Sequence, residues 1–301
     1  MDAADLEQAL REHPDDLATW LVYGDWLLER GDARGALIQL EQRRARARPA
    51  DRAALDAERD AIVKRHQAEW DAALPAGVTV VARRHGFATE IAVEWTDAAP
   101  ALIEQALRER LVTALRIDPP DDADLDSDDF DEDDFDEHGN PKPLPPLEAG
   151  ALAELDLGRL VELDLSYVNL GAPGAKALAA SLGRGTRLAA LDLRYCNIGN
   201  RGLAALAACP GLGGLRRLHL QRNGLTAAGV ASLQRFGALT ELDLRYNKLG
   251  AGGARALLEA PFIGSLARLH LHRTDISAAG VKKLARAAQL PPALRSYWRS
   301  V

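Results

Sequence analysis

The sequence predicts an α/β solenoid of repeated strand–helix units, preceded by an all-α N-terminal region. The hexapeptide pattern L-x-x-L-x-L recurs with starts 28, 27, 24 and 27 residues apart, at Leu160, Leu188, Leu215, Leu239 and Leu266. After each hexapeptide, an aliphatic residue, a glycine and a leucine follow at constant distances. Before residue 80, apolar residues recur every three to four positions, which is typical of amphipathic helices.

Each repeat is expected to form one short strand and one helix. The L-x-L alternation points both leucines to one side of a strand and the intervening residue to the other. The later glycine and leucine have helical spacing, and the small glycine permits close packing against the next unit. Because one unit cannot cover its own apolar face, the units must stack, with parallel strands on the concave side and helices on the convex side.

The repeats resemble leucine-rich repeats of the ribonuclease-inhibitor-like subtype, over residues 160–290. That resemblance implies an α/β leucine-rich-repeat solenoid. Its Asn/Cys position is occupied by Val168, Cys196, Asn223, Asn247 and Thr274. The shorter unit Leu152–Leu157 lies just upstream of the first full repeat, and it predicts a loop-connected cap or an extra strand. Residues 291–298 are expected to cap the last repeat, with a docking peptide as the alternative.

The N-terminal part is predicted to be helical, with breaks at His13–Asp16, Gly31–Asp32 and Pro49. Residues 13–40 resemble a short repeat-companion domain found at the N-terminus of bacterial proteins that often carry leucine-rich repeats. The core Tyr23-Gly24-Asp25-Trp26-Leu27 carries this resemblance, which implies no enzymatic activity. Residues 86–93 alternate like a strand, residues 98–110 read as a helix, and residues 112–117 read as a further strand of the repeat sheet.

Charge divides the chain into segments of different character. Residues 1–117 carry 16 basic and 21 acidic side chains, residues 118–140 none and 13, and residues 141–301 carry 21 and 10. The net charge of −7 therefore conceals an acidic segment beside a basic half. We expect four parts: a helical companion domain (1–80), a strand–helix–strand lead-in (81–117), an acidic flexible insert (118–147) and repeats with a C-terminal cap (148–301).

Composition narrows the class of protein. Two cysteines do not support a disulfide framework or a cysteine-built metal cluster. The sequence contains no run of about 18 apolar residues, so no membrane span is predicted. The first residues do not resemble a signal peptide. We therefore expect a cytoplasmic, bacterial-type protein. Motifs for nucleophilic catalysis and phosphate binding are absent from the sequence, which favours a protein that is not an enzyme and has no cofactor.

Three sequence features invite a metal or redox interpretation. The run Asp122–Asp128 alternates carboxylates like an EF-hand loop, but Ser127 and Asp133 stand where that loop needs Gly and Glu. A self-repelling acidic loop fits better, and folding of this loop onto the basic repeats is a further option. The histidines His219, His270 and His272 are expected on exposed strand positions, too widely spaced for a zinc site. Both cysteines, Cys196 and Cys209, are interpreted as buried structural thiols.

The expected concave surface consists of three columns of side chains. The first column contains Asp164, Asp192, His219, Asp243 and His270. The second contains Ser166, Arg194, Gln221, Arg245 and His272. The third contains Tyr167, Tyr195, Arg222, Tyr246 and Arg273. Three of only five tyrosines fall in the third column, and Tyr and Arg are enriched in binding hot spots.

These columns favour the function of a non-catalytic scaffold that binds a protein partner, which includes an acidic partner. The residues expected to bind it are Asp164, Tyr167, Asp192, Arg194, Tyr195, His219, Arg222, Asp243, Arg245, Tyr246, His270 and Arg273. One alternative is a regulator or inhibitor of an enzyme or GTPase, which the resemblance permits. A second alternative is nucleic-acid binding through the basic half, against which the acids of the first column count. The sequence does not predict the oligomeric state.

Overall fold

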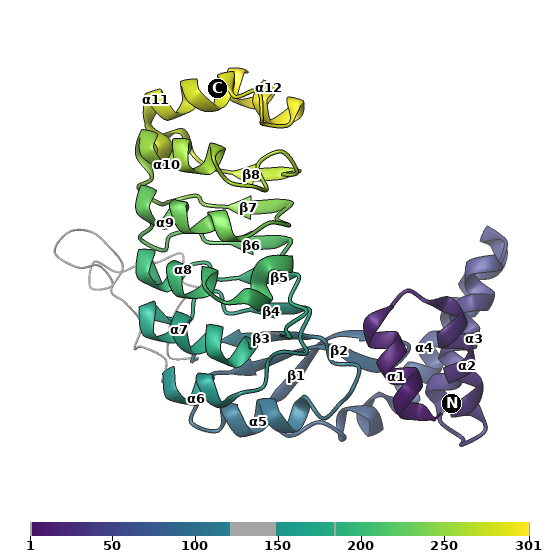
Figure 1. Cartoon of the computed structure of the whole chain (residues 1–301). Helices are drawn as coiled ribbons and strands as arrows, with labels where there is room; N and C mark the ends of the chain where they lie inside the picture. Colours follow the sequence, from purple (N-terminus) through teal and green to yellow (C-terminus); the bar gives the residue numbers. More distant parts are fainter. Residues whose placement is uncertain (1, 121–148, 184, 301) are drawn as a thin grey trace, which may run out of the picture. The chain divides into compact units, whose positions relative to one another are not determined.

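A computed structural model describes residues 2–120, 149–183 and 185–300 (Figure 1). The chain divides into two compact units. The first comprises Met1–Val93 and Ala101–Leu115, and the second comprises Glu94–Pro100 and Arg116–Val301. The acidic insert expected at 118–147, with its calcium-like run, lies outside the described residues except for residues 118–120.

Helices α1–α4 form the N-terminal part of the first unit, as the apolar spacing predicts. Their bounds are α1 Ala3–Glu12, α2 Leu17–Leu28, α3 Ala33–Arg46 and α4 Pro49–Asp71. Three of these helices begin after an aspartate whose carboxylate accepts a backbone N–H of the first turn: Asp2, Asp16 and Asp32. Such caps satisfy amide groups that have no partner within the helix. Pro49 starts α4, a position where its missing N–H costs no hydrogen bond.

The core of the first unit is built from side chains of α1–α3 and a strand. Buried Leu6, Leu10, Trp20 and Tyr23 pack together with Phe87. The Tyr23 hydroxyl donates a hydrogen bond of 2.8 Å to Glu7, which satisfies its polar end. Helices α2 and α3 approach so closely that a Cβ on Gly35 would lie 2.5 Å from the Gly24 carbonyl oxygen. Gly35 is therefore a packing requirement, whereas a Cβ on Gly24 would lie 3.1 Å from the Ile38 side chain.

The strands before the repeats are only partly those expected. The strand predicted at 86–93 is β2, Phe87–Glu94, and the strand predicted at 112–117 is β3, Ala114–Asp118. The predicted helix between them is shorter, α5 Ala99–Ala106. One strand was not predicted: β1, Val78–Arg84, pairs antiparallel with β2. Its signal is the β-branched run Val78–Val81, which favours a strand.

The second unit contains the repeats, in which each short strand leads to a helix. The parallel strands are β4 Glu162–Asp164, β5 Ala190–Asp192, β6 Arg217–His219, β7 Glu241–Asp243 and β8 Arg268–His270. The helices are α7 Gly171–Leu182, α8 Gly199–Ala207, α9 Ala227–Ser232, α10 Gly250–Leu258 and α11 Arg273–Arg286, with 3-10 turns at Pro210–Gly214 and Leu233–Arg235. Strand β3 precedes β4 in the strand order. In Figure 1 the strands stack on one side and the helices on the other; we call these the strand face and the helix face.

The leucines of the repeated hexapeptide fill the space between strands and helices. Leu163, Leu191, Leu218, Leu242 and Leu269 occupy one register across β4–β8, and each is less than 9% exposed. The repeat glycines let neighbouring helices approach each other. A Cβ on Gly202 in α8 would lie 3.0 Å from the Ala175 Cβ of α7, tighter than side-chain atoms normally pack.

The short unit Leu152–Leu157 is not an extra strand. Residues Ala149–Glu154 form helix α6, which contacts α7. Leu152 lies in this helix and Leu155 directly follows it, and both are buried. The first leucine of the hexapeptide thus belongs to a helix, and the prediction of an extra strand was wrong.

The chain beyond the last strand ends in a further helix. Helix α12, Pro292–Ser300, contacts α11, and its Trp298 is 1% exposed. Arg299 donates a hydrogen bond of 3.1 Å to the Ala285 carbonyl of α11. Helix α12 therefore packs on the last helix of the stack, where the cap was expected, and its role as a cap stays a prediction.

Candidate functional site

A ladder of buried polar side chains supports the turns that follow the strands. The Asn247 amide nitrogen donates to the carbonyls of Leu220, Leu244 and Arg245, while its oxygen accepts from the amides of Asn223 and Leu225. Asn223 makes equivalent bonds one repeat earlier. In the repeat before that, the thiol of Cys196 donates to the Leu165 carbonyl at 3.0 Å. Burial raises the pKa of Cys196, so this thiol is structural.

The ladder ends differently from the prediction. Thr274, expected at the Asn/Cys position of the last repeat, is exposed. The next residue, Asp275, is buried instead, and its carboxylate accepts from the amides of Tyr246 at 3.3 Å and His272 at 2.8 Å. The reason is that α11 begins at Arg273, so Asp275 falls in its first turn and serves as the N-terminal capping acid.

The ladder fixes an unusual backbone on the strand face. Tyr167, Tyr195, Arg222 and Tyr246 have φ values of 68°, 58°, 48° and 60°. This left-handed region costs a non-glycine residue about 1–2 kcal/mol. Amides of this group bond to carbonyls of the next repeat, including Tyr167 to Arg194 at 2.8 Å. We call these four residues the tyrosine–arginine row.

Side chains of the tyrosine–arginine row contact one another across repeats. The rings of Tyr167 and Tyr195 stack with centroids 4.8 Å apart, and the Arg222 guanidinium lies 5.6 Å from the Tyr195 centroid. Tyr246 packs against the ring of His272 at 4.7 Å. Exposure is 36% for Tyr167 and 55% for Tyr246, high for large aromatic side chains. The row is thus an exposed aromatic surface with a cation in its middle.

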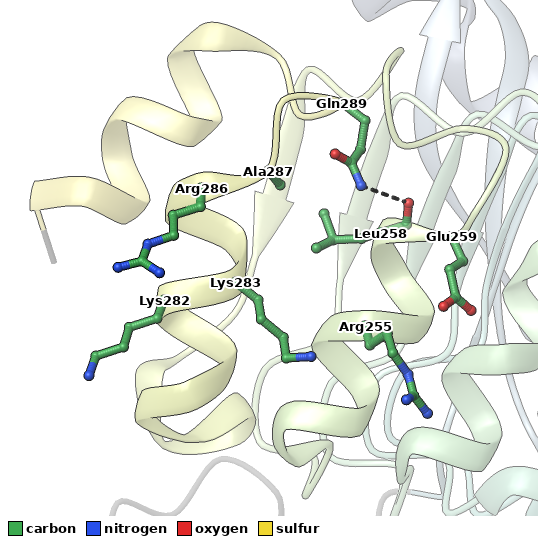
Figure 2. A pocket seen from close by; sticks show the side chains of 8 residues that line it. All are labelled: Arg255, Leu258, Glu259, Lys282, Lys283, Arg286, Ala287 and Gln289. Carbon is green, nitrogen blue, oxygen red and sulfur yellow. Dashed lines mark hydrogen bonds between the residues drawn. The ribbon is translucent and has the colours of Figure 1, made fainter.

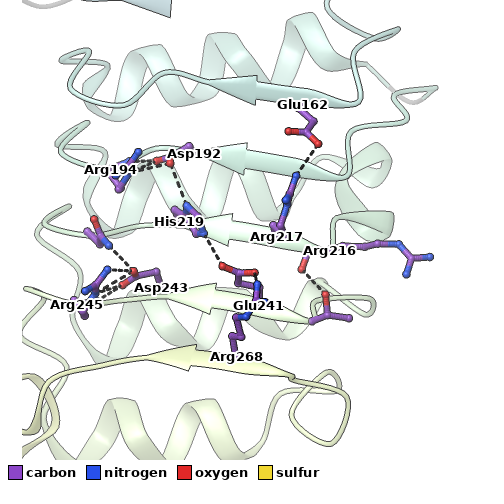
Figure 3. A network of polar contacts seen from close by, with 12 residues as sticks. Glu162, Asp192, Arg194, Arg216, Arg217, His219, Glu241, Asp243, Arg245 and Arg268 are labelled. Atoms are coloured by element: carbon purple, nitrogen blue, oxygen red, sulfur yellow. Dashed lines mark hydrogen bonds and ion pairs between the residues drawn. The ribbon is translucent and has the colours of Figure 1, made fainter. Parts of the chain in front are cut away.

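Beside the row, charged side chains of β4–β8 neutralise each other (Figure 3). His219 bridges two strands: its Nδ1 lies 3.1 Å from Asp192 and its Nε2 lies 3.3 Å from Glu241. Asp192 accepts from Arg194 at 2.8 Å, and Glu241 accepts from Arg268 at 2.9 Å. A separate pair, Arg217 and Glu162, spans β6 and β4 at 2.6 Å.

The pKa values follow from these contacts. Burial favours neutral Asp192, but the hydrogen bonds from His219 and Arg194 outweigh burial and lower its pKa. The hydrogen bond to Asp192 raises the pKa of His219 against the opposing effect of burial, and Glu241 adds to the rise. His219 therefore holds its proton to a higher pH than a free histidine, and the bridge between the strands is strongest when it is charged.

Asp243 was expected on the exposed side of its strand, and that expectation was wrong. The residue is 3% exposed. Its carboxylate accepts three bonds from the Arg245 guanidinium, the shortest of 2.6 Å, and a further bond from buried Gln221. Long neighbouring side chains have folded over the short aspartate, so that Asp243 positions Arg245 and Gln221 and is itself covered.

The other predicted binding residues mostly share the expected register. Asp164, Asp192, His219, Asp243 and His270 are paired partners along β4–β8. The turn residues form the tyrosine–arginine row except at the last repeat, where Arg273 is the first residue of α11 and lacks the left-handed backbone. Helix α11 starts at once after β8, and the third column therefore ends at Tyr246.

The histidines that invited a metal interpretation are engaged otherwise or dispersed. His219 contacts Asp192 and Glu241, and His272 packs on Tyr246. Within the described ranges, no three His, Cys, Asp or Glu side chains gather as metal ligands would. None of the described helices combines the length and the apolar character needed to cross a membrane.

The parallel strands, repeated helices and buried ladder define an α/β repeat solenoid. Four stretches of it match the family model described as Leucine Rich repeat: residues 160–179, 188–207, 215–233 and 239–258. Residues 160–258 are therefore leucine-rich repeats, and β8 with α11 continues the same architecture beyond the matched stretches. Such repeats generally serve as protein-interaction modules and are typically non-catalytic. No curated protein matches the chain.

Proposed function

We propose that this protein is a non-catalytic scaffold that binds a partner protein on its strand face. The observation that carries the proposal is the tyrosine–arginine row, whose four residues share a strained backbone conformation on successive repeats. Tyr167, Arg222 and Tyr246 are exposed, and Tyr195 is half-buried between them. Glycine adopts this conformation at no steric cost. Tyrosine and arginine at these positions therefore indicate that their side chains have a role that offsets the strain.

The chemistry of the row suits a protein partner. Rigid aromatic rings and a guanidinium contribute large contact area with few side-chain torsions to order on binding. Arg222 forms no ion pair that competes for it within the described part of the chain, so a carboxylate or carbonyl of the partner can occupy it. By contrast, Arg194 and Arg245 already neutralise Asp192 and Asp243. We therefore assign these two arginines and their aspartates a supporting part in the surface.

The remaining predicted residues complete the surface at its rim. Asp164, His219, His270 and Arg273 are assigned to secondary contacts beside the row. We retain the repeat-companion interpretation of the N-terminal helices, the bacterial-type cytoplasmic location and the absence of a cofactor as parts of the same proposal. Regulation of an enzyme or GTPase would be a special case of it.

The proposal is tested by affinity capture from native cells, with quantitative mass spectrometry. The test variant is Tyr195→Ala, Arg222→Ala, Tyr246→Ala, which removes three of the four side chains of the row and leaves the buried ladder intact. A matched control, Lys176→Ala with Arg201→Ala, removes exposed side chains of α7 and α8. We expect the row variant to lose proteins that the wild type and the control both retain, at unchanged circular dichroism. Equal recovery by all three proteins refutes the proposal.

A further inference from the structure

Exposed basic side chains occur on both faces of the repeat half, and those of the helix face have few acids beside them. Along residues 171–300, Asp192, Glu241 and Asp243 lie on strands and are paired with arginine or histidine, and Asp275 is buried. This leaves Glu259 as the one exposed acid among these residues. Exposed cations on α7–α12, in contrast, include Lys176, Arg201, Arg255, Lys282, Lys283, Arg286 and Arg299.

These cations are densest where α10 and α11 meet. A shallow pocket there is lined by Arg255, Lys282, Lys283 and Arg286, together with Leu258, Glu259, Ala287 and Gln289 (Figure 2). All four cations are exposed, and no described acid forms an ion pair with them. In Figure 2, Lys283 extends from α11 toward α10, while Lys282 and Arg286 point outward. Four like charges held this close repel each other unless an anion binds.

From this cluster we propose a second binding site, in which the α10–α11 pocket takes an acidic segment of a partner protein. The pocket has features that suit a polypeptide. Glu259 can accept a backbone N–H of the bound segment. The Gln289 side chain, whose amide nitrogen lies 3.5 Å from the Leu258 carbonyl, offers a further polar contact. Leu258 provides a small apolar contact between the charges.

Two other polyanions fit this pocket less well. Single-stranded nucleic acids bind through aromatic side chains on which bases stack, and neither α10 nor α11 contains an aromatic residue. A lipid surface is usually entered by exposed large apolar side chains, and those exposed in the described residues lie outside α7–α11.

The test uses the full chain and a short fluorescein-labelled peptide in which Glu alternates with Ser, with a Gln/Ser peptide as the uncharged probe. Fluorescence anisotropy at low salt measures the affinity. The variant Lys282→Glu, Lys283→Glu removes two attractions and adds two repulsions, and exposed charge pairs of this kind predict about tenfold weaker binding. The control Lys176→Glu, Arg201→Glu places the same charges on α7 and α8, outside the pocket, and it should weaken binding by less than about threefold because the attraction between charges falls with distance.

The outcomes separate the alternatives. Binding of the Glu peptide alone, lost in the α11 variant and retained in the control with thermal unfolding unchanged, supports the site. No binding to the wild type, or an equal loss in both variants, overturns it. Tighter binding of oligonucleotides or anionic vesicles than of the peptide would assign the surface to another class of ligand. If the peptide bound only after deletion of residues 121–140, the ligand of the pocket would be the chain's own acidic segment, and the proposal of a partner would be overturned.

Discussion

Replacing Arg245 by Ala should destabilise the repeats strongly, because it leaves the Asp243 carboxylate buried with too few donors. The guanidinium supplies three hydrogen bonds to Asp243. Only the Arg245 backbone amide and Gln221 remain after its removal. Deleting one partner of a buried ion pair costs about 3–5 kcal/mol. Two donors persist and the arginine side chain is 36% exposed, so we reduce the expected loss to about 2 kcal/mol.

Arg194→Ala provides the matched comparison at the same position two repeats earlier. Asp192 is more exposed than Asp243, 15% against 4% for the side chains, and it keeps its bond to His219. We expect a loss of about 1 kcal/mol for this variant. Urea denaturation at neutral pH, followed by far-UV circular dichroism, gives both free energies of unfolding. If Arg245→Ala costs no more than Arg194→Ala, burial of Asp243 does not decide its energetics.

The sign of the pH dependence gives a second check on the same variant. Burial favours neutral Asp243, but the bonds from Arg245 and Gln221 outweigh burial and lower its pKa. A carboxylate whose pKa is lowered in the folded state stabilises the fold at pH above its unfolded-state pKa. This stabilisation is lost as pH falls through the folded-state pKa. The deficit of Arg245→Ala should therefore be largest near neutral pH and shrink below about pH 4. The double variant Asp243→Asn, Arg245→Ala removes the buried charge and should recover most of the loss. A double variant as unstable as Arg245→Ala would refute the reasoning.

Three further predictions concern the ladder, the row and the histidine bridge. Asn247→Ala should lower the free energy of unfolding by about 3 kcal/mol in urea denaturation, because it leaves buried carbonyls and amides without partners; a loss below 1 kcal/mol would contradict the ladder's role. Tyr246→Gly should be about 1 kcal/mol more stable than Tyr246→Ala because its backbone is left-handed, and equal melting temperatures would count against strain there. The raised pKa of His219 predicts that the wild type loses stability relative to His219→Gln as pH rises through the folded-state pKa, from above about 6.5; parallel melting curves across that range would disprove it.

The repeats were predictable because their leucines obey one spacing throughout. The leucine spacing of each hexapeptide predicts a strand and the side of it that is buried. The stacking of the repeats follows from the need to cover apolar surface. The same spacing failed at Leu152–Leu157, where the first leucine lies in a short helix and no strand forms. Strand β1 was missed for a related reason, since a short β-branched run has little periodicity to distinguish it.

The candidate site was predictable in its positions and only partly in its exposure. The register of the columns follows from the repeat, so Tyr167, Tyr195 and Tyr246 could be grouped from the sequence. Whether a polar strand residue reaches solvent depends on the side chains of its neighbours. The spacing of residues in the sequence does not predict that Arg245 covers Asp243. The left-handed turn has no usual sequence mark either, because tyrosine and arginine are not the residues that favour it.

Ionic strength should separate the two proposed surfaces. On the strand face the charges beside the tyrosine–arginine row are already paired, for example Asp192 with Arg194, so a partner there gains mainly aromatic contact area. On the helix face the cations Lys282 and Lys283 have no described acid to neutralise them, and binding there depends on charge that salt screens. The wild type should therefore capture, at physiological salt, a partner that the row variant loses. Only at low salt should it capture a partner that the α11 variant loses. If both partners responded to salt alike, the division of charge between the two faces would not govern binding, and one surface would suffice to explain both.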